Sequence, residues 1–95
     1  MRYSIDTNTA PRPANAFAQG AVRGPLLQVS GQGPVDIESG EFVGLGDAAV
    51  QTRRTLENIE AILVAGGATF ADALQVRVYL TSRDDFAAMN AAYNE

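Results

Sequence analysis

The feature that most constrains the fold is a stripe of small and apolar residues at helical spacing between Asp47 and Gly66. The Asp47 carboxylate can accept hydrogen bonds from the free N–H groups of a first helical turn, and Gly66-Gly67 is a typical stop signal. The spacing therefore predicts one long helix that packs this stripe on a sheet. The stripe consists of Ala49, Thr52, Leu56, Ile59 and Leu63.

Short extended segments precede this helix. Asn, Pro and small residues make the first part of the chain a poor helix, so we expect extended chain there. Arg23-Gly24-Pro25 is a turn signal, and it predicts a hairpin. The first strand contains Phe17, Ala18 and Val22, and the second covers residues 26–30.

The chain after the helix predicts one more strand and one more helix. Residues 74–80 alternate, with Leu74, Val76, Val78 and Leu80 on a face expected to be buried. The opposite face, which includes Arg77 and Tyr79, is either wet or covered by another subunit. A capping box at Ser82 and Asp85 then begins a helix. Its predicted buried stripe is Phe86, Met89 and Tyr93.

Composition removes many kinds of chemistry. The chain has 95 residues, which is enough for one small domain over residues 1–95, and it contains no Cys, His, Lys or Trp. Nucleophilic triads, zinc sites, Schiff bases and P-loops all require some of these residues. The net charge of −4 argues against a general nucleic-acid binder. With no signal peptide and no apolar stretch that could span a bilayer, a cytoplasmic protein is the expectation.

Two positions could contact a ligand, and each has a plainer interpretation. The second strand stops at Ser30-Gly31, where glycine would let a ligand approach the backbone, although a Ser-Gly step after a strand is more often a simple turn. Asn90 places an amide beside an apolar helix face. That amide either bonds to nearby backbone or faces a ligand.

One motif resembles a dinucleotide-binding fingerprint, but a helix cap explains it better. Gly44-Leu45-Gly46 and the residues after it match the G-x-G-x-x-A dinucleotide fingerprint before a helix. The preceding Phe42-Val43 is too short for a buried parallel strand, and Asp47 would place a carboxylate where a pyrophosphate binds. A helix cap after a flexible loop explains the same residues, so no cofactor is expected.

The final residues predict a break inside a helix. Tyr93-Asn94-Glu95 carries no cap, no glycine and no polar tail. We therefore expect further C-terminal chain, including the last strands of the sheet, that is absent from this sequence.

The order of several motifs resembles the RidA/YjgF/YER057c/UK114 family. The resemblance implies an α+β, chorismate-mutase-like fold in which two helices pack on one face of a sheet. It also implies a homotrimer with ligand clefts between subunits. Well-known members hydrolyse reactive enamines and imines of the 2-aminoacrylate type to a 2-oxo acid and ammonia, without a cofactor or metal. The motifs are residues 18–20, 29–35, 51–59, 78–81 and 85–90.

The resemblance also implies roles for individual residues. Ser30 and the N–H group of Gly31 correspond to substrate-binding groups, and Asn90 corresponds to an asparagine near the cleft. Phe17 stands where active members often have tyrosine, so one wall of the cleft loses a hydroxyl group. The family's substrate-carboxylate arginine and its acidic residue lie beyond Glu95, so no catalytic residue is assigned.

Two other functions remain open. The first is a trimeric protein of the same family that binds small molecules such as 2-oxo acids, without catalysis, and Phe17 motivates it. The second is an endoribonuclease or translation inhibitor, as some members have been described. That activity fits poorly with a negatively charged chain that lacks lysine.

Overall fold

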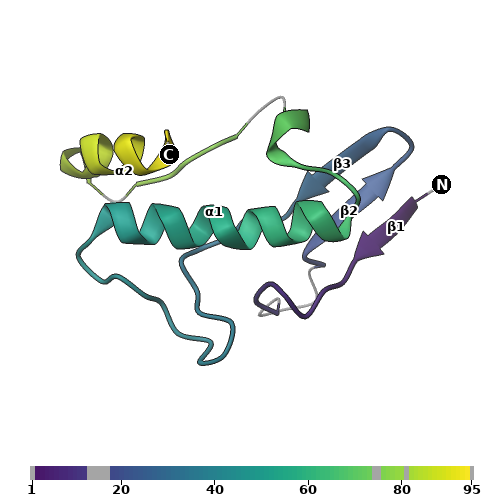
Figure 1. The fold of residues 1–95 in the computed structure, drawn as a ribbon, viewed down its shortest axis with the longest axis horizontal. Helices are drawn as coiled ribbons and strands as arrows, with labels where there is room; N and C mark the ends of the chain where they lie inside the picture. Colours follow the sequence, from purple (N-terminus) through teal and green to yellow (C-terminus); the bar gives the residue numbers. More distant parts are fainter. Residues whose placement is uncertain (1, 13–17, 74–75, 81, 95) are drawn as a thin grey trace.

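The computed structural model describes residues 2–12, 18–73, 76–80 and 82–94. Figure 1 shows a small sheet at one end of a long helix, with a second, shorter helix beside the opposite end of that helix. The elements in chain order are β1 (Arg2–Ile5), β2 (Gly20–Arg23), β3 (Leu26–Val29), α1 (Ala48–Ala65), the 3₁₀ turns η1 (Phe70–Asp72) and η2 (Arg83–Asp85), and α2 (Phe86–Tyr93).

The sheet is antiparallel, with strand order β1-β2-β3. Gly20 lies opposite Ile5 on one side and opposite Val29 on the other. The turn between β2 and β3 places Gly24 at φ +57°, a left-handed conformation that glycine adopts without strain. The predicted hairpin is confirmed at this turn. The strand β1, which the sequence indicated only as extended chain, completes the sheet.

The helix α1 begins and ends where the sequence predicts. The Asp47 carboxylate accepts hydrogen bonds from the N–H groups of Ala49 and Val50, each at 3.1 Å. At the other end, the Gly66 N–H donates to the carbonyls of Ile62 at 3.0 Å and Leu63 at 3.1 Å. Both ends thus satisfy backbone groups that a helix leaves without partners.

The core lies where α1 meets the sheet. It is formed by Ile5, Ala10 and Ile62, which are 4%, 1% and 0% exposed. Space there is so limited that a Cβ atom on Gly66 would lie 2.5 Å from Leu27 Cδ1. A side chain at position 66 would therefore have to displace the ends of the Leu27 and Ile5 side chains.

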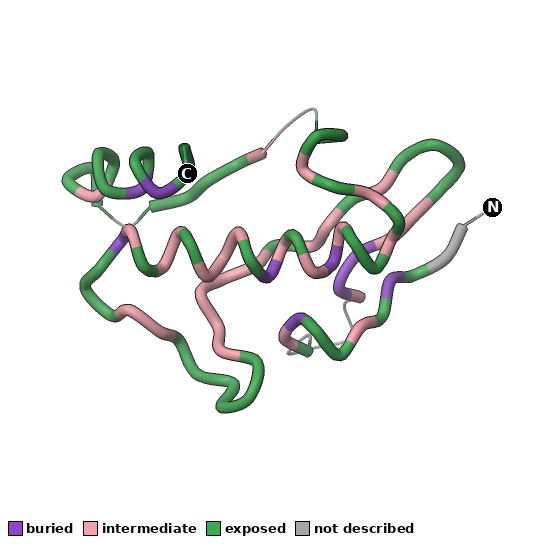
Figure 2. The backbone as a smooth tube through the Cα atoms, viewed as in Figure 1, coloured by how far each residue is buried: buried purple, intermediate pink, exposed green. Residues whose placement is uncertain are grey.

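The buried side of α1 differs from the predicted stripe. Ala48, Asn58 and Ile62 are buried, whereas all five stripe residues are only half-buried. Figure 2 shows that most of α1 is half-buried or exposed. At 3.6 residues per turn, the stripe is centred roughly 140° around the helix from Asn58. The prediction was wrong because the predicted stripe left out both Ile62 and the hydrogen-bonded amide of Asn58.

Residues 76–80 form no strand, so the strand predicted over residues 74–80 is wrong in its described part. Val78 is 43% exposed and Leu80 is 39% exposed, although both were expected to be buried. A strand needs a hydrogen-bonded neighbour, and none of the described strands pairs with this segment. Leu74 lies outside the described residues.

The second helix packs on α1, and only part of its predicted stripe is buried. The Ser82 hydroxyl accepts a hydrogen bond from the Asp84 N–H at 3.2 Å and caps η2, from which α2 continues. Met89 is 7% exposed, but Phe86 and Tyr93 are 57% and 39% exposed. This short helix turns one side toward α1, and the described chain leaves much of its other side uncovered (Figure 2).

No described helix combines the length and the apolar character needed to cross a membrane.

Candidate functional site

Ser30 is held firmly just beyond the end of β3. Its N–H donates to the carbonyl of Gln19 at 3.0 Å, and its hydroxyl donates to the carbonyl of Ala18 at 2.6 Å. The Gln32 side chain in turn donates to the Ser30 carbonyl at 3.2 Å. The hydroxyl proton is therefore used within the chain, while the hydroxyl oxygen can still accept a hydrogen bond.

Gly31 is exposed, and the space beside it is open. A Cβ atom built on Gly31 would meet nothing within 4 Å. Two residues later, a Cβ atom on Gly33 would make ordinary contact with the Phe42 ring at 3.9 Å. Gly31 thus presents backbone that another molecule can reach, and its contact with a ligand stays a prediction.

Asn58 holds the chain that follows this glycine. Its side-chain Nδ2 donates to the carbonyls of Gly33 and Val35, each at 3.0 Å. Sequence reasoning missed this residue, although an asparagine four positions before the core residue Ile62 was an available signal. The amide joins α1 to the segment that leaves β3.

Gln19, just before β2, also holds backbone in place through a buried side-chain amide. It is 2% exposed, and its side chain accepts from the Thr7 N–H at 2.7 Å. Its Nε2 donates to the carbonyls of Thr7, Ala10 and Pro11 at 3.1, 3.2 and 2.9 Å. The residue was also missed as a candidate, and it fixes the N-terminal segment beside the carbonyl groups that hold Ser30.

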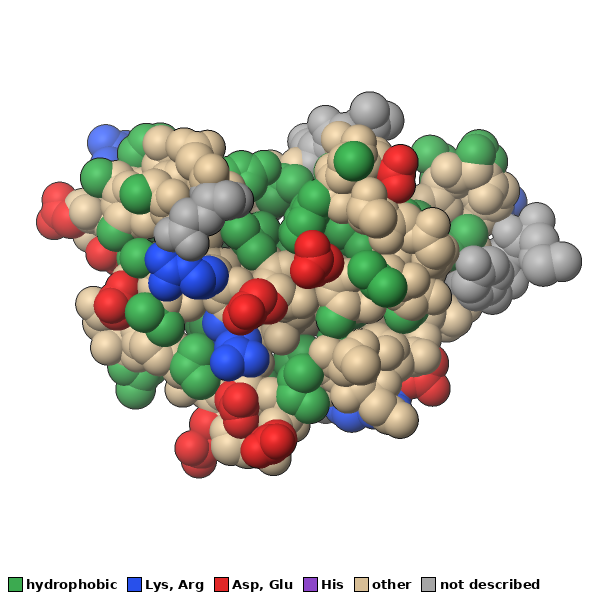
Figure 3. Space-filling model, in the orientation of Figure 1, with side chains coloured by type: hydrophobic (Ala, Val, Ile, Leu, Met, Phe, Trp, Pro, Cys, Tyr) green, Lys and Arg blue, Asp and Glu red, His purple; other side chains and the backbone are tan. Residues whose placement is uncertain are grey.

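The loop after this segment carries an acidic group with a lowered pKa. The Asp36 carboxylate accepts from the Ser39 N–H at 2.9 Å, and this hydrogen bond is the main reason that the pKa of Asp36 lies below its usual 3.8. Acidic side chains gather along the lower edge of Figure 3, where this loop lies. The arginines on the same face are interspersed with acidic residues (Figure 3).

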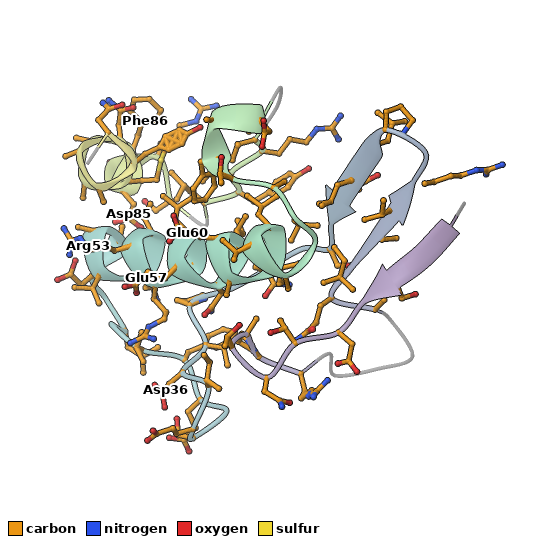
Figure 4. All side chains as sticks on the ribbon, turned by 45° about the vertical axis from the view of Figure 1, so that its right-hand side comes forward. Asp36, Arg53, Glu57, Glu60, Asp85 and Phe86 are labelled. Carbon is orange, nitrogen blue, oxygen red and sulfur yellow. The ribbon has the colours of Figure 1, made fainter. Side chains whose placement is uncertain are left out.

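No hydrogen bond links the Asn90 side chain to Ser30 or Gly31 in the described part of the chain. Asn90 is exposed on α2, and α1 lies between α2 and the loop of residues 36–46 that carries Asp36 (Figure 1). In Figure 4, Phe86 at the start of α2 and Asp36 in the loop likewise lie on opposite sides of α1. Phe17 lies outside the described residues.

Within the described ranges, no group of three or more His, Cys, Asp or Glu side chains could hold a metal ion.

Comparison with known proteins finds a family model and relatives that match nearly the whole chain. The family model "Endoribonuclease L-PSP" matches residues 7–95. A RutC family protein of Pyrococcus horikoshii is 44% identical over 95 residues, which are 100% of this chain and 75% of the relative. The 2-iminobutanoate/2-iminopropanoate deaminase of Escherichia coli is 36% identical over 93 residues, covering 98% of this chain and 71% of the enzyme.

Solved structures of similar proteins match the fold of this chain. The crystal structure of E. coli TdcF with bound serine matches with a TM-score of 0.91 at 36% identity, over 97% of this chain and 71% of that one. RidA from a Psychrobacter species matches with a TM-score of 0.89 at 31% identity, over 97% of this chain and 73% of that one. The chain therefore spans between two thirds and three quarters of these relatives.

Proposed function

We propose that this chain, which belongs to the endoribonuclease L-PSP family, also called RidA/YjgF, is a hydrolytic deaminase of reactive enamines and imines. The substrate class is the 2-imino acid or its enamine form, and the products are a 2-oxo acid and ammonia. The deaminase name of a relative at 36% identity supports this class. The chain has the α+β fold of the RidA-family structures.

The reaction needs little from the protein's own functional groups. Water adds to the imine carbon, the carbon–nitrogen bond of the resulting carbinolamine breaks, and ammonia leaves while a C=O bond forms. An imine already reacts with water, so the protein must mainly bind the substrate and place the water molecule. A chain without His, Cys or Lys is compatible with this chemistry.

The observation that carries the proposal is the exposed Gly31 beside the fixed Ser30. In this proposal the Gly31 N–H binds a polar group of the substrate, and the Ser30 hydroxyl oxygen accepts a hydrogen bond from it. Asn90 and Phe17 are the further substrate-binding residues that we propose. Since no hydrogen bond joins Asn90 to Gly31 within the described chain, we propose that they meet across a cleft between the subunits of a homotrimer.

The test is turnover of 2-aminoacrylate supplied by a dehydratase, followed as release of 2-oxo acid. We expect acceleration over the buffer rate, and its absence would reject the proposal. Gly31→Ala should fold normally, because its Cβ enters open space, but should lose activity where that Cβ displaces the substrate. Gly33→Ala is the matched control and should keep activity, since its Cβ only touches the Phe42 ring.

A second function is a trimeric binding protein without catalysis. One observation favours it: the Ser30 hydroxyl donates its proton to Ala18, so it has none to offer a substrate. Calorimetric titration with 2-oxobutanoate and with serine, the ligand in the TdcF structure, distinguishes the two functions. Binding without turnover would favour the second function, and turnover would exclude it.

A further inference from the structure

Asn58 is the buried side chain that ties α1 to the segment after Gly31. It is 1% exposed, and of the described residues only it and Gln19 are both polar and buried. Its Nδ2 donates both of its hydrogen bonds at 3.0 Å, to the carbonyls on either side of Pro34. A buried amide is stable only when it is hydrogen-bonded in this way.

The exposed backbone at Gly31 lies between two fixed points. On one side, Ser30 is held by the carbonyls of Ala18 and Gln19. On the other, Asn58 holds Gly33 and Val35, and the ring of Pro34 fixes the backbone φ angle between them. Only Gly31 and Gln32 lie between these anchors, so the direction of the Gly31 N–H depends on both.

We propose that Asn58 is a positioning residue, which sets the direction of the Gly31 N–H toward the substrate without touching the substrate. The effect on KM that this inference predicts rests on the proposed function. No apolar residue of similar size could replace Asn58 in this role, because the Val35 carbonyl would lose its donor and the Gly33 carbonyl would keep only the Val35 N–H. The segment would still be held at the Pro34 carbonyl by the Val43 N–H at 2.8 Å, but it would no longer be tied to α1.

The test compares Asn58→Leu with Ile62→Val. Both changes affect buried residues of the same helix, one turn apart, but Ile62 packs in the core with Ile5 and Ala10. Asn58→Leu should raise KM for the imine about tenfold with kcat changed less than about twofold, since lost binding alone acts on KM. Ile62→Val should leave both constants of the folded protein unchanged. An unchanged KM in Asn58→Leu, or an equal rise in both variants, would overturn the proposal.

A measurement without substrate separates this inference from the proposed function. Amide hydrogen exchange followed by NMR should become at least about tenfold faster at Val35 and Val43, whose N–H groups donate to the Gly33 and Pro34 carbonyls, in Asn58→Leu, and it should be unchanged in Ile62→Val. If the wild-type chain turns over no imine, the proposed function fails while this exchange result still decides whether Asn58 anchors the segment. Unaltered exchange would overturn the anchoring role.

Asn58→Asp keeps the side-chain size and serves if the leucine variant does not fold. Its carboxylate cannot donate, but the protonated acid can donate one hydrogen bond. The KM defect should therefore shrink as pH falls through the carboxyl pKa. The defect of Asn58→Leu should not change with pH, and identical profiles for the two variants would contradict the proposal.

Discussion

Residues 2–66 and residues 76–94 both expose large apolar side chains, such as Leu45 in the first region and Tyr79 in the second, but they differ in the core that they form. In the first region Ile5 and Ile62 are almost fully buried where α1 meets the sheet. Of the described residues in the second region, only Met89 and Ala92 are buried.

This difference indicates which contacts stabilise each region. The sheet, α1 and the loop pack on one another within the chain, and the side chains of their two buried amides, Gln19 and Asn58, donate to backbone carbonyls. Helix α2 contacts mainly α1, and residues 76–80 and 82–94 pair with no described strand. We therefore expect the free energy of unfolding to depend mainly on the first region, and four experiments test this expectation.

The largest effect is expected from Ile62→Ala. Ile62 is 0% exposed, and removing its outer carbons leaves a cavity between α1 and the sheet. The free energy of unfolding should fall by about 2–5 kcal/mol, as measured by urea denaturation. A loss below about 1 kcal/mol would mean that this core does not dominate stability.

The next effect is expected from Gln19→Leu. The substitution removes the donor for the carbonyls of Ala10 and Pro11 and the acceptor for the Thr7 N–H. Stability should fall by about 1–3 kcal/mol because buried backbone groups lose their partners. The matched control is Gln28→Leu at an exposed position of β3, which should change stability by less than about 0.5 kcal/mol. Equal losses would refute the role of the buried amide.

A smaller effect is expected on α2. Phe86 is 57% exposed, so Phe86→Ala should lower stability by less than about 1 kcal/mol even though it removes a whole ring. Met89→Ala, at the buried position three residues later, is the internal comparison and should lower stability more. A large loss in Phe86→Ala would show that this surface is covered in solution, for example by a second chain, and would weaken the contrast between the two regions.

The smallest effect concerns pH. The Ser39 N–H lowers the folded-state pKa of Asp36 below 3.8, so the stabilising contribution is present above the unfolded-state pKa and is lost as pH falls through the folded value. An NMR titration of the Asp36 carboxyl should give a midpoint below 3.8. Ser39→Ala should raise that midpoint only partly, because the backbone N–H remains. A midpoint at or above 3.8 would contradict the assignment.

How far the sequence predicted the fold depended on the distance between interacting residues. The ends of α1 and the turn at Gly24 were predictable, because Asp47 and Gly66 act on their own helix and the turn involves adjacent residues. The burial of Asn58 was not, since its partner Gly33 lies 25 positions away. Residues 74–80 have the composition of a strand, but composition cannot supply a neighbouring strand.

In the candidate site, too, features set by neighbouring residues were predictable and those set by distant contacts were not. The exposed strand end at Gly31 was predictable from an apolar run that stops at Ser-Gly. The anchors Gln19 and Asn58 were not, because only the folded chain shows which carbonyls they meet. The joint role of Asn90 and Phe17 with this strand end stays a prediction, to be tested by activity and by the mass of the assembled protein.

The close contact at Gly66 has a consequence for how this sequence can vary. At Gly24 a Cβ atom would meet nothing within 4 Å, and only the backbone angle of +57° disfavours other residues. Asparagine or aspartate should therefore be tolerated there in a library of variants. At Gly66 the angle is −87°, which any residue adopts, and a larger residue would have to displace the ends of the Leu27 and Ile5 side chains. Replacements at position 66 should therefore be selected more often together with a smaller residue at position 5 or 27.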